Sequence, residues 1–383
     1  MTPLRVLIVE DSRTVRERLV EVLREDPGFQ VVGQVGDGVS AIRLCERLRP
    51  DVISLDMVLP GMSGLEVTQR IMATRATPIL VVSASINRGE AFDALDALNA
   101  GAVDIFEKSR MLQGTQWEEE LKGALRLVSR IRVVTRARAA ALPDSVRFRG
   151  SESRLSVAKE CSPDTVPERE SVLSATDAGQ PRIVALGAST GGPAALAAIL
   201  GQLPLNFRLP VLVVLHMAVL FAPSLVEWLG RQSALKVSLA RDGDPVPLPG
   251  AGAPVILAPP GRHLIVEAGK LRLSNAPERH SCRPSADVLF ESIALEYGAR
   301  AVAGVLTGMG RDGALGLLRL RRLRAMTFAQ DEATSAVFGM PHEAIQVGAV
   351  ELVLPLEQIA GTLVQASLSV GERSSGGCTP FCS

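Results

Sequence analysis

Short apolar runs alternate with amphipathic stretches along the first 130 residues of this 383-residue chain. The apolar runs predict strands, and the stretches between them have the spacing of amphipathic helices. Strand and helix repeated five times are typical of a parallel sheet covered on both faces. The pattern predicts a doubly wound (βα)5 domain over residues 1–130, with strands at Arg5–Val9, Gln30–Val35, Asp51–Leu55, Pro78–Val82 and Val103–Phe106.

A second ordered region begins at Arg182 and continues to residue 366. Its alternating pattern predicts another doubly wound α/β domain with a mainly parallel sheet. Between Leu235 and Leu273 the connections are short and hairpin-like, so we expect that part of this sheet to be antiparallel. The predicted strands are Ile183–Leu186, Val211–Leu215, Val255–Leu257, Ala301–Leu306 and Met326–Ala329.

The two predicted domains are separated by residues 131–181, which are rich in Arg, Ser, Pro and Glu and have little apolar periodicity. This composition is typical of a long flexible linker. The last residues, 367–383, are rich in Ser and Gly and are predicted to be a disordered tail.

The composition of the chain argues against several classes of protein. The net charge is zero and aromatic residues make up only 3% of the chain, so neither electrostatic attraction to nucleic acid nor a base-stacking surface is indicated. The cysteines are scattered, which argues against a disulfide framework and favours a reducing cytosol. The N-terminus resembles a strand and not a signal peptide, and no apolar run approaches the ~20 residues of a membrane span. We therefore expect a cytoplasmic protein with no membrane span.

Polar residues follow four predicted strands of the first domain at their C-terminal ends, where doubly wound sheets bind ligands. Three converging carboxylates would repel one another, and a Mg²⁺ ion ligated by oxygen would relieve that repulsion. Any one of these residues could simply cap a strand. Together they predict that Asp56 attacks a phosphoryl donor while the metal and Lys108 offset the charge and Ser83 donates a hydrogen bond. The predicted site comprises Glu10, Asp11, Asp56, Ser83 and Lys108.

These residues lie in the runs VEDS, LDMVLPGMSG, VVSA and EK. Together the runs resemble the receiver domain of two-component response regulators over the whole segment. The resemblance implies phosphorylation of Asp56 by a histidine kinase, with Glu10, Asp11 and Asp56 as the Mg²⁺ site. One position departs from the family pattern, because Ser109 follows Lys108 where the family usually has proline.

In the second domain the first predicted strand leads into GASTGG and then a helix, which places Ser189 near a helix N-terminus. The next strand ends at His216, and a later strand leads into MGRDG with Asp312. These three side chains could meet as nucleophile, general base and orienting carboxylate. The glycine-rich turn is also compatible with a nucleotide-binding loop, or with a purely structural turn.

Other polar residues favour structural roles. His263, His280 and His342 are expected in loops or at helix ends, and Asp287 is expected to cap a helix.

The runs GASTGGP, HM, APPGRHL, HSCRPSADVLF, VLTGMGRDGA, AQDE and VFGMP together resemble the catalytic domain of chemotaxis protein-glutamate methylesterases of the CheB type. The resemblance implies Ser189 as nucleophile, His216 as base and Asp312 as its partner. It also implies an oxyanion site made by the backbone N–H groups of Thr190 and Met309. Ala218 stands where the family usually has proline.

The two resemblances imply a phosphorylation-activated esterase, with the receiver covering Ser189 in the resting state. It would hydrolyse glutamate γ-methyl esters, and deamidate glutamines, on the cytoplasmic helices of chemoreceptors. A chemotaxis histidine kinase would be the phosphodonor, the esterase would need no cofactor, and the protein would be a monomer. Two alternatives remain at this point: a receptor-binding adaptor without catalysis, and a nucleotide-dependent enzyme that uses Gly191 and Gly192.

Overall fold

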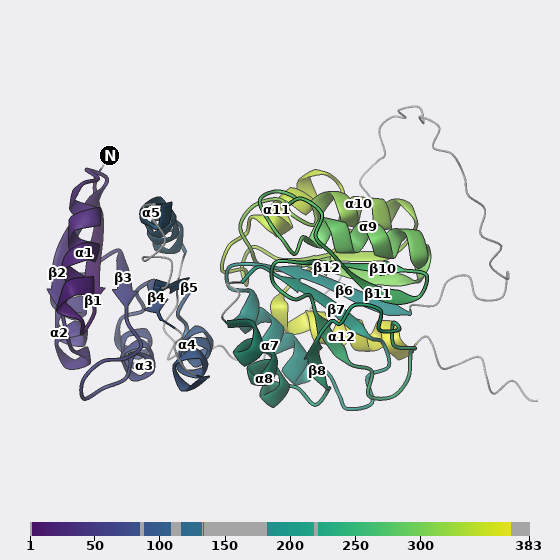
Figure 1. Cartoon of the computed structure of the whole chain (residues 1–383), viewed down its shortest axis with the longest axis horizontal. Coiled ribbons are helices and arrows are strands. Elements are labelled where there is room, and N and C mark those ends of the chain that lie inside the picture. Colours follow the sequence, from purple (N-terminus) through teal and green to yellow (C-terminus); the bar gives the residue numbers. More distant parts are fainter. Residues whose placement is uncertain are drawn as a thin grey trace, which may run out of the picture.

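The computed structural model describes residues 2–84, 88–108, 116–131, 133, 182–217 and 221–368. Most of the predicted linker, the predicted tail and the two departing positions, Ser109 and Ala218, lie outside these residues. Two α/β domains are present, as expected, and they lie side by side in Figure 1. No helix among the described residues is both long and apolar enough to cross a bilayer.

The N-terminal domain is built on a five-stranded sheet in the order β2-β1-β3-β4-β5, in which every pairing is parallel. The middle strands form because they are continuous runs of buried aliphatic residues, the pattern of a sheet covered on both faces. The predicted (βα)5 architecture is therefore confirmed. The strands are β1 (Leu4–Val9), β2 (Phe29–Val35), β3 (Val52–Leu55), β4 (Ile79–Ser83) and β5 (Asp104–Glu107).

Helices cover both faces of this sheet, and local sequence signals fix where two of them begin. Asp37 caps α2 by accepting a hydrogen bond from the Ser40 backbone N–H. Ser63 and Glu66 form a reciprocal capping box at the start of α3. The helices are α1 (Arg13–Arg24), α2 (Gly38–Leu48), α3 (Gly64–Thr74), α4 (Arg88–Ala100) and α5 (Gln116–Ser129).

The C-terminal domain has a seven-stranded sheet in the order β14-β13-β12-β6-β7-β9-β8, again with parallel pairings throughout. The prediction that part of this sheet is antiparallel is wrong. The antiparallel strands β10 (His263–Glu267) and β11 (Lys270–Ser274) form a separate hairpin, closed by a tight turn with positive φ at Ala268 and Gly269. The main-sheet strands are β6 (Ile183–Ala188), β7 (Val211–Leu215), β8 (Val237–Leu239), β9 (Val255–Leu257), β12 (Ala301–Val305), β13 (Met326–Gln330) and β14 (Leu352–Leu354).

Helices pack on both faces of the second sheet as well. The last of them ends two residues beyond the predicted domain limit. They are α7 (Gly192–Gln202), α8 (Ala222–Gln232), α9 (Ala286–Glu296), α10 (Ala314–Arg322), α11 (Met340–Gln346) and α12 (Leu356–Leu368), with a short 3-10 turn, η3 (Gly298–Arg300).

The two domains meet where α4 of the first packs against α7 and α8 of the second (Figure 1). The Trp228 indole N–H donates to Asp96 Oδ1 at 2.7 Å, and Arg88 forms an ion pair with Glu227. The Arg231 guanidinium lies 4.3 Å from the centre of the Phe92 ring. The contact therefore combines buried apolar packing with charged and aromatic pairs.

Candidate functional site

The acidic residues of the first domain meet at the C-terminal edge of its sheet. Glu10 and Asp11 follow β1, and Asp56 follows β3, so parallel strands bring all three to one place. Their carboxylate oxygens can lie within 4.8 Å of one another. Lys108 follows β5 and places its ammonium 2.9 Å from Glu10 Oε2 and 2.8 Å from Asp56 Oδ2.

The single positive charge of Lys108 does not neutralise the negative charge of the three carboxylates. Burial and the neighbouring Asp56 carboxylate raise the pKa of Glu10 from 4.5 to about 7, against the opposing effect of Lys108. Burial also raises the pKa of Asp56 above its usual value. Asp56 Oδ1 is buried and has no hydrogen-bond partner among the described residues. A small cation ligated by oxygen, such as Mg²⁺, fits this donor set.

Ser83 lies at the end of β4, as predicted, but its hydroxyl is directed toward α4. Ser83 Oγ donates to Glu90 Oε1 at 2.8 Å, and the Ala84 backbone N–H donates to the same oxygen at 3.0 Å. Glu90 lies in the first turn of α4, the helix that contacts the second domain. The residue beside the acidic site is therefore joined directly to the interdomain helix.

Ser189 follows β6 and lies just before α7, in the turn that the sequence predicted. Gly191 adopts a left-handed conformation, with φ of 78°, in which a side chain would be strained. A Cβ at Gly191 would lie 2.6 Å from Ala336 Cβ, and one at Gly192 would lie 2.5 Å from Leu215 Cδ1. These glycines allow close packing of protein against protein, so their presence at this turn has a structural reason.

His216 and Asp312 are brought together from two different strands. His216 follows β7, and Asp312 lies between β12 and α10. The His216 Nε2 atom lies 3.0 Å from Asp312 Oδ2, so the Nδ1 atom is the nitrogen left to serve the serine. The described residues contain no hydrogen bond between Ser189 Oγ and His216. Catalytic contacts of this kind often tighten only when substrate is bound.

The Asp312 carboxylate is held by the start of α9. The Ser285 hydroxyl donates to Oδ1 and the Ala286 N–H donates to Oδ2, both at 2.6 Å. The Asp287 N–H also donates to Oδ1, at 3.2 Å. Burial opposes ionisation, but hydrogen bonds from His216 and Ser285 lower the pKa of Asp312 below its usual value. Asp312 is therefore a fixed negative charge.

This charge changes the ionisation of His216. Burial alone would lower its pKa, but hydrogen bonds to Asp312 and Cys282 outweigh burial and raise the pKa from 6.5 to about 9. An imidazole that acts as a base must first be neutral. In the arrangement seen here, the neutral form of His216 becomes the majority only above about pH 9.

The loop after β12 lies against the nucleophile. The Ser189 N–H donates to the Thr307 carbonyl oxygen at 3.0 Å, and the Thr307 hydroxyl donates to the Thr190 carbonyl oxygen at 2.9 Å. A Cβ at Gly308 would lie 2.8 Å from Ser189 Cβ. The backbone before Met309 thus passes close to Ser189, on the side where an oxyanion site is expected.

Sequence reasoning missed the residues that hold this arrangement. The Gln330 side chain accepts a hydrogen bond from the Thr307 N–H at 2.9 Å and fixes the loop. Gln330 lies in the AQDE run, but the run alone does not indicate a partner. Ser285 is the N-cap of α9, and a serine directly before a helix is the signal that could have identified it.

Asp287 was predicted to be a helix cap, and this prediction is wrong. It lies in the first turn of α9 and is fully buried, with its carboxylate bonded to the Gly316 N–H at 2.7 Å and to His280 Nε2 at 3.0 Å. His263 lies in β10, not in a loop, and accepts a hydrogen bond from the Ser285 N–H. His342 lies in the first turn of α11, as expected.

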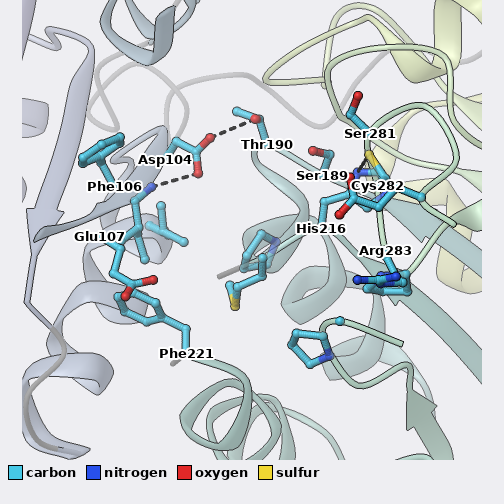
Figure 2. Close-up of a pocket in the computed structure, with 18 residues that line it drawn as sticks. Asp104, Phe106, Glu107, Ser189, Thr190, His216, Phe221, Ser281, Cys282 and Arg283 are labelled. Carbon is cyan, nitrogen blue, oxygen red and sulfur yellow. Dashed lines mark hydrogen bonds between the residues drawn. The ribbon is translucent and has the colours of Figure 1, made fainter. Parts of the chain in front are cut away.

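Figure 2 shows that Ser189, His216 and Cys282 lie together on one wall of a cavity, facing Asp104, Phe106 and Glu107 of the first domain. The cavity has a volume of about 500 Å³. The Thr190 hydroxyl donates across the interface to Asp104 Oδ2 at 2.8 Å. The first domain therefore contacts the residue next to the nucleophile, whereas Ser189 itself lines the cavity.

Comparison with known proteins decides the family. Residues 184–363 match the CheB methylesterase family, and residues 6–113 match the response regulator receiver domain. A protein-glutamate methylesterase/protein-glutamine glutaminase from Nitrosospira multiformis is 40% identical over 377 residues, which cover 97% of this chain and 99% of that protein. The chain belongs to the protein-glutamate methylesterase/protein-glutamine glutaminase family.

Two further proteins are similar to this chain. Protein-glutamate methylesterase/protein-glutamine glutaminase 2 from Anaeromyxobacter dehalogenans is 40% identical over 362 residues, which cover 94% of this chain and 96% of that protein. The crystal structure of the Thermotoga maritima CheB methylesterase catalytic domain is 35% identical, with a TM-score of 0.46, and matches 49% of this chain and 98% of that chain. The predicted enzyme class, a receiver-linked methylesterase and glutaminase of chemotactic adaptation, is confirmed by this membership.

Proposed function

We propose that Ser189, His216 and Asp312 form the catalytic triad of this methylesterase, and that its substrates are glutamate γ-methyl esters on the cytoplasmic helices of chemoreceptors. The observation that carries this assignment is the 3.0 Å contact between His216 Nε2 and Asp312 Oδ2 in the domain whose cavity also exposes Ser189. An adaptor without catalysis would not need a buried carboxylate held by three donors behind a histidine.

The reaction follows from the positions of these groups. His216 Nδ1 takes the proton of Ser189 as Ser189 Oγ attacks the ester carbonyl, and Asp312 stabilises the imidazolium that forms. Methanol leaves with the proton from His216, and water then hydrolyses the acyl-serine to glutamate. With a glutamine substrate the same steps release ammonia.

The tetrahedral intermediate carries a negative oxygen that needs donors. We assign this role to the backbone N–H groups of Thr190 and Met309. The close approach of Gly308 to Ser189 and the hydrogen bond between Thr307 and Thr190 support the assignment. No metal takes part in these steps of the proposal.

Control begins at Asp56, the proposed phosphorylation site, with a chemotaxis histidine kinase as phosphodonor. Glu10, Asp11 and Asp56 would hold Mg²⁺, which offsets the charge of the phosphoryl group during transfer. Lys108 already lies 2.8 Å from Asp56 Oδ2 and would pair with a phosphoryl oxygen.

The signal then reaches the interface through α4. For Ser83 to donate to the phosphoryl group, its hydroxyl must leave Glu90 in the first turn of that helix. A later turn of α4 holds the second domain through the bond between Asp96 and Trp228. Loss of the Ser83–Glu90 bond would therefore shift the population from the covered form toward an open one. The predicted linker, residues 131–181, would permit that movement within a monomer.

Methanol release from methylated receptor tests the triad. The wild type should release methanol, and Ser189→Ala should release it about 10⁶-fold more slowly because the nucleophile is lost. Full activity in Ser189→Ala would show that the triad assignment is wrong. Receptor binding by the wild type without methanol release would favour the adaptor.

A further inference from the structure

Cys282 is a free thiol beside the proposed base, and the esterase mechanism gives it no role. It lies in the HSCRPS run, lines the cavity and is partly exposed. Cys282 Sγ lies 3.8 Å from His216 Nδ1, and its S–H donates to the His280 carbonyl oxygen at 3.4 Å. The thiol therefore faces the same nitrogen that would take the proton of Ser189.

We propose that Cys282 and His216 form a site for a borderline-soft divalent cation, with Zn²⁺ as the best fit, and that its occupation inhibits the esterase. Imidazole nitrogen and thiolate sulfur are the donors that zinc prefers. Tetrahedral ligands about 2.1 and 2.3 Å from one zinc ion lie roughly 3.6 Å apart, close to the separation of Sγ and Nδ1. Water would fill the remaining positions.

The surroundings of His216 support a metal on Nδ1. The other ring nitrogen bonds to Asp312, and a carboxylate in that place orients an imidazole and increases its basicity toward zinc. The Sγ atom, an imidazole nitrogen and an Asp312 oxygen all lie within 4.8 Å of one another. Asp312 thus supports the site from behind, and Ser285 and Ala286 hold it in place.

The two donors must lose their protons before they can bind zinc. When zinc binds, the Cys282 S–H bond breaks and the sulfur–zinc bond forms, the His216 Nδ1–H bond breaks and the nitrogen–zinc bond forms, and both protons go to solvent.

Inhibition follows because zinc would bind to the lone pair of His216 Nδ1, which must receive the Ser189 proton. The inhibition rests on the proposed function, since it requires His216 to be the base. Zinc binding does not rest on the proposed function, since it depends only on the positions of Cys282 Sγ and His216 Nδ1. Binding and inhibition can therefore be measured separately.

Binding is tested with Co²⁺ on the full-length protein, because cobalt accepts the same ligands and shows a thiolate charge-transfer absorption in the near ultraviolet. Wild type should give this absorption and Zn²⁺ should abolish it. Cys282→Ala should lack it although the other four cysteines remain. The matched control is Cys45→Ala, which removes a buried thiol of the first domain and should keep the absorption.

Inhibition is measured as methanol release in Zn²⁺ relative to each variant's own rate in a chelator. The Zn²⁺ concentration for half inhibition should rise at least about 10-fold in Cys282→Ala and stay unchanged in Cys45→Ala. Equal zinc sensitivity of wild type and Cys282→Ala, or a cobalt absorption that survives in Cys282→Ala, overturns the site. If the wild type releases no methanol even in chelator, the proposed function fails while the absorption still decides the metal site.

Discussion

Two clusters of buried carboxylates lie at the C-terminal edges of the two parallel sheets, and they differ in how their charge is balanced. In the receiver, burial and mutual repulsion raise the pKa of Glu10 to about 7 and raise that of Asp56. In the esterase domain, hydrogen bonds lower the pKa of Asp312 although it is equally buried. The receiver cluster lacks positive charge, whereas Asp312 has a full set of hydrogen-bond donors.

The difference matches two kinds of chemistry. A cluster short of cations gains from binding Mg²⁺ and a phosphoryl group, so its state depends on what is bound. A carboxylate fixed by Ser285, Ala286 and His216 is ready to stabilise an imidazolium without reorganisation. The receiver site is therefore suited to switching and the esterase site to catalysis.

Removing the Asp312 carboxylate should have the largest effect. Asp312→Asn should lower kcat by about 10⁴-fold, because His216 loses the group that orients it and stabilises its charge. The pH at which His216 titrates should also fall, because the hydrogen bond to Asp312 helps to raise its pKa to about 9. The pH dependence of methanol release checks both effects.

Asp287→Asn is the matched control for Asp312→Asn. Asp287 is also a buried carboxyl group near the start of α9, but its partners are His280 and Gly316. The Asp287→Asn variant should have a lower Tm than the wild type, with little change in the pH at which His216 titrates. Equal losses of kcat in the two variants would contradict the special role of Asp312.

A smaller effect is expected at the interface. Trp228→Phe keeps most of the packing but removes the hydrogen bond to Asp96, which contributes about 1 kcal/mol. The basal rate of the unphosphorylated enzyme should therefore rise about 5-fold. Trp117→Phe, in the receiver core, should leave the basal rate unchanged. A basal rate in Trp228→Phe equal to wild type would mean that this bond does not hold the domains closed.

The smallest effect concerns the stability of the receiver. Because the folded-state pKa of Glu10 is raised, the free energy of unfolding should fall as pH rises from 4.5 to about 7. Mg²⁺ should restore it, with a rise in Tm on the order of 5 °C at pH 8 and little change at pH 5. Glu10→Gln should lose most of this pH dependence. An equal Mg²⁺ effect at both pH values would argue against the imbalance of charge.

Sequence patterns predicted the features that are determined by neighbouring residues along the chain. Apolar periodicity located the strands, and strand ends located Asp56, Ser189 and His216 because parallel strands present those ends at one edge. Contacts between distant segments were not predictable. No local pattern indicates that Ser285 bonds to Asp312, or that Ser83 turns to Glu90 and not toward the acidic site. Such contacts depend on packing that forms only in the folded chain.

Phosphorylation of Asp56 is expected to uncover Ser189, and this is measured as methanol release with and without a small-molecule phosphodonor and Mg²⁺. The wild-type rate should rise on the order of 10-fold with phosphodonor, the size of a typical coupling between sites. Asp56→Asn should keep the basal rate and lose the rise. An equal rise in Asp56→Asn and wild type would show that phosphorylation of Asp56 does not control access to Ser189.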